Sequence, residues 1–196
     1  MKYYRLRDDI NFASRWYLGD MQHVDNWLYR NPPVDFMEPR KGNLEVYQHG
    51  NEMDFTLTER YAVPIVSEDF IGALSGLSEV DKPYHYVVFN KTEILDTAAS
   101  KSYFTMAIET QLDCVDELKS DFTKYEINDP VRPDRAGEYS AFFNLVIDPS
   151  KTEGKHIFRI KKHLGAIIVS EEVKNRLEAA GITGAVFESV NGDVKQ

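Results

Sequence analysis

Catalytic chemistry would need a nucleophile beside a base, and this chain offers few candidates for either role. Ser67 and Ser170 lie outside any G-x-S-x-G pattern, and both fit better as serines that cap helices. Cys114, the single cysteine, is flanked by Asp113 and Asp116, whose negative charges raise a thiol pKa and disfavour the reactive thiolate. We therefore expect a buried structural cysteine.

Metal and cofactor chemistry also lacks a local signature. The five histidines are scattered, with no H-E-x-x-H pair and no C-x-x-C partner for zinc, and there is neither a P-loop nor a G-x-G-x-x-G fingerprint. Adjacent acids such as Asp8 and Asp9 point in different directions and make poor acid/base pairs. We expect no catalytic residue, no metal and no cofactor, although a site assembled from distant residues leaves no such pattern.

The chemically distinctive residues are acidic. The net charge is −9, and residues 62–150 hold 16 Asp and Glu against 7 Lys and Arg, densest from Glu109 to Glu138. Such a surface steers a basic protein partner and repels nucleic acid and anionic membranes, although acidity also simply maintains solubility. We predict six partner-binding carboxylates: Asp113, Asp116, Glu117, Asp121, Glu126 and Asp129.

These carboxylates must be positioned by a fold in which strands outnumber helices. Apolar runs predict strands at residues 2–7, 16–18, 84–89, 103–114, 142–147, 156–160, 166–169 and 185–190. The length of 103–114 leaves room for a bulge or bend. Because turns separate most of them, we expect an α+β single domain, residues 1–196, with a mixed, mostly antiparallel sheet. Residues 31–60 collect prolines and glycines and predict a long loop or arm.

Two segments predict a strand that runs directly into a capped helix. Ser170 follows the apolar run 166–169, and the acids after it complement the helix dipole, while Gly181 ends the helix. Ile65-Val66-Ser67-Glu68 repeats the same pattern earlier in the chain. Internal duplication and independent use of one capping chemistry both account for the repeat.

Size and composition favour a folded cytoplasmic protein. The chain has 196 residues, 42% of them hydrophobic, which is enough to fold without disulfides or metals. A single cysteine cannot form an internal bridge, and neither an apolar leader nor a long apolar run is present. We expect a cytoplasmic location.

Several motifs in a fixed order resemble one protein family. They are Trp16–Asp20, Val63–Glu68, Leu112–Asp116, Phe143–Pro149, His156–Arg159, Ile168–Glu172 and Ala180–Gly184. Together they resemble the polymorphic-toxin immunity proteins of the myxobacterial immunity-protein type, formerly a domain of unknown function. The resemblance covers most of residues 15–30 and 62–190.

This resemblance implies a bacterial protein, encoded beside a toxin, that binds the toxin's C-terminal domain and protects the producing cell. The resemblance implies no catalytic residue in this chain. The acidic stretch favours a basic toxin domain, with a nuclease as the target class, whose active site the protein occludes. Two alternatives are a small enzyme that reverses toxin damage and a non-catalytic structural protein that forms homo-oligomers. The oligomeric state is left open.

Overall fold

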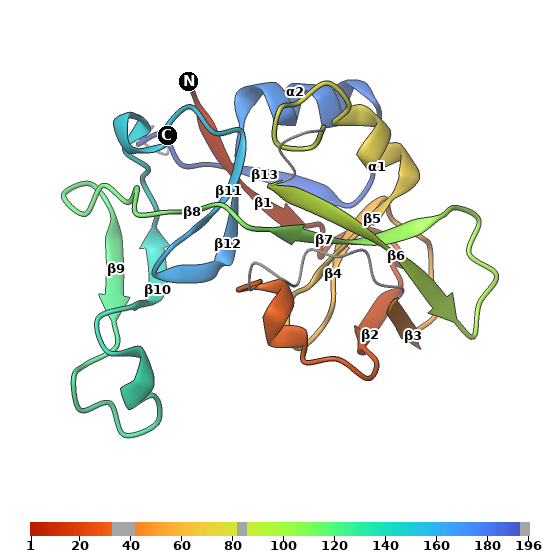
Figure 1. Cartoon of the computed structure of the whole chain (residues 1–196), viewed down its shortest axis with the longest axis horizontal. Helices are drawn as coiled ribbons and strands as arrows, with labels where there is room; N and C mark the ends of the chain where they lie inside the picture. Colours follow the sequence, from red (N-terminus) through yellow and green to blue (C-terminus); the bar gives the residue numbers. More distant parts are fainter. Residues whose placement is uncertain (33–41, 82–85, 193–196) are drawn as a thin grey trace.

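The computed structural model describes residues 1–32, 42–81 and 86–192. Figure 1 shows many strands and two α-helices, α1 and α2, that lie together along one side of the molecule. The chain is mixed α and β, mostly sheet with few helices, which confirms the predicted α+β class.

The first sheet has the strand order β13–β1–β12–β11–β8. The bounds of these strands, in that order, are Ala185–Ser189, Tyr3–Asp8, His163–Ser170, Ile157–Ile160 and Gln111–Leu112. The β11–β8 pair is parallel and the other pairs are antiparallel. The apolar run 166–169 forms the buried centre of β12, as its lack of alternation predicts.

The second sheet has the strand order β2–β3–β6–β7–β5–β4. The bounds, in that order, are Tyr17–Met21, Gly42–Gln48, Val87–Leu95, Tyr103–Ile108, Pro64–Ser67 and Phe55–Leu57. The β3–β6 pair is parallel, and the remaining pairs are antiparallel.

The expectation of one sheet, with one strand over residues 103–114, is wrong. The chain leaves the second sheet after β7, where the Glu109 N–H donates to the Tyr86 carbonyl. It then joins the first sheet, where the Thr110 carbonyl accepts from the Arg159 N–H at 2.9 Å and β8 pairs with β11. Apolar and polar residues follow one another through this crossing much as within a strand, so the pattern hides the change of sheet.

The expectation of a loop over residues 31–60 is also wrong for much of that range. Residues 42–48 form β3 and residues 55–57 form β4, while residues 33–41 lie outside the described part of the chain. Leu44 and Phe55 are fully buried, so tertiary packing outweighs the local turn composition. Gly42 packs against the end of the flexible Met21 side chain, which a Cβ at this position would have to displace.

Both helices begin at a serine that follows a buried strand. The Ser67 Oγ accepts from the Phe70 N–H before α1, Glu68–Ala73, and the Ser170 Oγ accepts from the Val173 N–H before α2, Glu171–Ala179. Gly181, at φ +69°, ends α2 in a left-handed turn that bonds Ile182 back to Leu177. The capping residues and the helix end therefore follow from sequence chemistry.

The main core lies between the two sheets and the two helices. Its buried members include Leu6 and Ile167 from the first sheet, Val66 and Met106 from the second, and Leu177 from α2. A second apolar cluster lies between the first sheet and the segments around Cys114 and Tyr139. Both faces of the first sheet are thus covered. The second cluster packs the segments of the acidic stretch against that sheet.

One buried carboxylate joins three separate segments. Asp54 Oδ1 accepts from Ser67 Oγ at 2.8 Å and from Lys101 Nζ at 2.7 Å. Its Oδ2 accepts from the Thr183 backbone N–H at 3.0 Å and from the Thr183 hydroxyl at 2.7 Å. Burial alone would raise the pKa of this carboxyl, but the bonds from Lys101, Thr183 and Ser67 outweigh burial and lower the pKa to about 2.

Candidate protein-binding surface

The acidic stretch includes a hairpin that stands apart from the two main sheets. Strands β9, Asp121–Lys124, and β10, Tyr139–Asn144, form their own antiparallel pair. Figure 1 shows this hairpin at the left of the view, with the long 125–138 connection at its far end. The connection contains a short 3-10 helix, Pro133–Arg135.

Aromatic side chains hold the hairpin against the first sheet. Tyr139 is buried, and its ring packs edge-on against Phe122 at 5.1 Å between centroids and lies 4.7 Å from Phe142. Phe142 in turn packs edge-on against His163, at the start of β12, at 5.2 Å. The His163 Nδ1 lies 3.1 Å from the Tyr139 carbonyl. The hairpin is therefore fixed in orientation through packing and hydrogen bonding.

Three of the six predicted residues come together at the base of this hairpin. Asp113, Asp116 and Glu117 line a recess of about 720 Å³ with Tyr139 and Leu118. Tyr139 donates from its hydroxyl to Glu117 Oε1 at 2.5 Å, which fixes one carboxylate at the recess.

Each of these acids already has a lysine partner, which sequence counting did not reveal. The ion pairs are Asp113 with Lys162 at 3.2 Å, Asp116 with Lys119 at 2.9 Å, and Glu117 with Lys124 at 2.7 Å. The hydrogen bond from Lys119 lowers the pKa of Asp116, and those from Lys124 and then Tyr139 lower the pKa of Glu117. The recess is therefore a mosaic of both charges rather than a uniformly negative face.

The other three predicted residues lie further along the hairpin and do not join the recess. Asp129 turns inward, where its Oδ1 accepts from the Val131 and Arg132 N–H groups at 2.9 and 2.7 Å and closes its own loop. Asp121 and Glu126 are exposed, and neither has an ion-pair partner among the described residues. These two carboxylates carry the uncompensated charge of the hairpin.

Sequence reasoning missed the apolar part of this surface. Leu118 is 99% exposed, Ile127 82%, Val131 79% and Phe143 67%. Leu118 and Phe143 lie at the base of the hairpin, and Ile127 and Val131 lie in the connection at its far end. The sequence pattern that could have predicted it is a large apolar residue between charged neighbours, such as Leu118 between Glu117 and Lys119.

We call these four apolar residues, together with Asp121 and Glu126, the hairpin surface. Exposed apolar side chains at both ends of one projecting element offer two anchoring points to a protein, whereas singly scattered ones are normal on any surface. The aromatic anchors hold this surface in place before any partner arrives, which reduces the entropy lost on binding.

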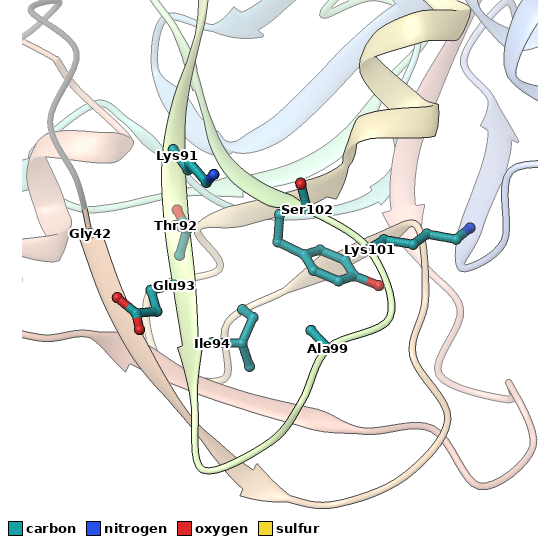
Figure 2. A pocket seen from close by; sticks show the side chains of 9 residues that line it. Gly42, Lys91, Thr92, Glu93, Ile94, Ala99, Lys101 and Ser102 are labelled. Carbon is teal, nitrogen blue, oxygen red and sulfur yellow. The ribbon is translucent and has the colours of Figure 1, made fainter.

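A separate pocket of about 450 Å³ lies between β6 and the turn that leads into β7. Figure 2 shows Lys91, Thr92 and Glu93 on one side and Lys101 directed away from them. The Lys101 Nζ lies 2.7 Å from Asp54 and 2.8 Å from Asp69, and these bonds raise its pKa. A raised pKa is the wrong direction for a lysine nucleophile, so Lys101 here is a structural cation.

The described part of the chain contains neither a metal-binding cluster nor a membrane-spanning helix. Across residues 1–32, 42–81 and 86–192, no three His, Cys, Asp or Glu side chains converge in a group that could hold a metal. In the same ranges, no helix is long and apolar enough to span a membrane.

The sequence of this chain matches the model of a known protein family. A search of curated proteins finds nothing similar to this chain. A family model described as "Immunity protein family (Imm11)" matches residues 14–192, which is most of the chain and includes every motif that carried the sequence resemblance. The chain therefore belongs to the Imm11 immunity protein family, as its motifs predicted.

Proposed function

We propose that this protein binds the toxic C-terminal domain of a secreted bacterial toxin in the cytoplasm of the producing cell. Binding neutralises the toxin because the protein covers its active site. Membership of an immunity protein family supports a protective role. The hairpin surface is the part of the molecule that we assign to the contact.

The observation that carries this assignment is the exposure of Leu118, Ile127, Val131 and Phe143 on one projecting hairpin. Exposed apolar area of this kind is released from water when a partner covers it, which favours association. Leu118, Ile127 and Val131 are more exposed than any other large hydrophobic residue in the described part of the chain. Interface hot spots contribute about 2 kcal/mol or more each and are most often aromatic or arginine residues, so the aromatic Phe143 is the first hot-spot candidate of this set.

Charge supports a basic partner. The net charge is −9, and Asp121 and Glu126 add unpaired carboxylates between the two apolar ends of the hairpin surface. A nuclease domain is the target class we propose, because a surface that grips phosphate groups carries the cations that attract carboxylates. The ion-paired acids Asp113, Asp116 and Glu117 then form the rim of the contact, where they add specificity more than affinity.

Titration calorimetry with the C-terminal domain of the toxin encoded beside this protein tests the proposal. We expect a one-to-one complex that the double variant Leu118→Asp/Phe143→Asp weakens at least a hundredfold. The matched control Ile10→Asp/Tyr47→Asp changes two residues that are 70% and 73% exposed outside the hairpin, and it should bind normally. Circular dichroism shows whether each variant folds.

Two results would count against the proposal. Equal loss of binding in both double variants would place the contact elsewhere. Protection of cells by much less protein than toxin would favour an enzyme that reverses toxin damage, because a binding inhibitor must match its target mole for mole.

A further inference from the structure

Arg159, on β11, is a fully buried arginine with most of its hydrogen-bonding capacity unused. Its side chain is 0% exposed, and its Nη1 donates to the Leu164 carbonyl at 2.5 Å. Its Nε and Nη2 have no hydrogen-bond partner among the residues that the structure describes. These two groups form one edge of the guanidinium, and that edge binds a carboxylate or phosphate through two parallel hydrogen bonds.

The surroundings of Arg159 are positively charged. No described acidic side chain forms an ion pair with Arg159. The half-buried Arg30 lies close enough that its charge, after the larger effect of burial, helps to lower the pKa of Arg159 to about 9. Arg159 is thus still cationic at neutral pH. A buried cation without a counterion is costly, so the site favours an anion that would pair with it.

A pocket lies against the neighbouring strand, β8, and Arg159 itself does not line it. Arg159 is directly paired with Gln111 of β8, so both side chains project from the same face of the first sheet. Gln111 lines a pocket of about 570 Å³ with Pro32 and Thr110, and the Thr110 carbonyl accepts from the Arg159 N–H. The Gln111 Nε2 donates to Asn31 Oδ1 at 2.9 Å in an exposed bond, which costs little to displace.

We propose that Arg159 is the receptor for an oxyanion, which enters through the pocket beside Gln111 and accepts from Nε–H and Nη2–H together. Arg30 supplies a second positive charge near the same position. Glu109, Glu153 and Lys155 line this pocket, and their summed charge of −1 weakly disfavours highly charged anions. A singly charged carboxylate is therefore the favoured ligand, ahead of phosphate.

Thermal unfolding of the full chain in acetate or inorganic phosphate, with sodium chloride holding the ionic strength constant, tests this site. We expect acetate to raise the Tm in a saturable way, by about 3–5 °C at ten times its Kd. Arg159→Met should lose this response and, without anion, should unfold at the same temperature as the unchanged protein or higher. Arg132→Gln removes an exposed arginine paired with Asp134 and should respond normally.

A second measurement does not depend on how the variants fold. In the unchanged protein, the NMR signal of the Arg159 Nε–H should shift with added acetate until the site is saturated. Arg159→Lys should weaken the binding of acetate at least tenfold, because lysine lacks the pair of parallel N–H donors. A response to phosphate alone would also support an oxyanion site. No response to either anion, or an equal response in Arg159→Met, overturns the proposal.

An internal carboxylate is the competing explanation. Asp35 and Glu38 lie outside the described residues, and a full-length Asp35→Asn/Glu38→Gln variant removes both charges. If acetate raises the Tm of that variant but not of the unchanged protein, the partner of Arg159 belongs to the chain itself and the proposed ligand site is wrong.

Discussion

The hydroxyl of Tyr139 donates a hydrogen bond to Glu117 at 2.5 Å, and so joins the buried anchor of the hairpin to its exposed acidic base. Tyr139 is 1% exposed, whereas the Glu117 side chain is 46% exposed and also pairs with Lys124. A single bond therefore links the orientation of the hairpin to the charges that surround the recess.

Removing that bond should destabilise the protein modestly. Tyr139→Phe keeps the ring packing against Phe122 and Phe142 but loses the donor, so we expect the free energy of unfolding to fall by about 1 kcal/mol. Urea denaturation measures this change. Tyr47→Phe removes the hydroxyl of a tyrosine that is 73% exposed and should have no effect, so an equal loss in both variants would contradict the role given to the bond.

Asp54 should make the protein sensitive to acid. Its pKa is about 2 in the folded state and about 3.8 in the unfolded chain, so the unfolded state takes up a proton first as the pH falls. The stabilisation is present in full above about pH 4 and is lost as the pH falls through 2. Its size is about 2 kcal/mol, from a shift of nearly two pKa units.

Asp54→Asn tests this link between pH and stability. Unfolding free energies measured between pH 6 and pH 2.5 should fall less steeply in the variant than in the unchanged protein, and the variant should be less stable at pH 6. Asp9→Asn, at a partly exposed carboxylate with no ion-pair partner among described residues, is the matched control. Parallel pH curves for Asp54→Asn and the unchanged protein would show that the Asp54 network contributes no acid sensitivity.

The unpaired carboxylates of the hairpin surface should act mainly on the rate of association. Asp121→Lys/Glu126→Lys should slow association with the toxin domain about tenfold at low salt and leave dissociation nearly unchanged. Stopped-flow kinetics at several salt concentrations measures both rates. Glu59→Lys/Glu93→Lys changes the net charge equally at exposed positions outside the hairpin, and an equally slow association there would mean that only the total charge matters.

Features set by neighbouring residues were predictable from the sequence. Ser67 and Ser170 cap helices, Gly181 takes a positive φ, and Cys114 is buried, with burial raising its pKa to about 12. Capping and left-handed turns depend on a few adjacent residues, whereas the burial of Cys114 was expected from the residue type and its acidic neighbours and is produced by distant strands. The family resemblance was readable for a similar reason, since it rests on short motifs in order.

Features set by distant pairing were not predictable in this way. Asp113 is neutralised by Lys162, and β8 pairs with β11 rather than continuing β7, through contacts some fifty residues apart in the chain. The acidic stretch therefore looked uniformly negative when only its own residues were counted. The exposure of Leu118 and the unused edge of Arg159 likewise depend on what the fold places around them.

Amide hydrogen exchange of the protein, alone and bound to the C-terminal domain of the toxin encoded beside it, shows which surface the toxin covers. We expect slowed exchange on binding to concentrate in residues 117–144, which contain the hairpin surface. Protection confined to the second sheet, for example to β2 and β3, with residues 117–144 unchanged, would contradict it.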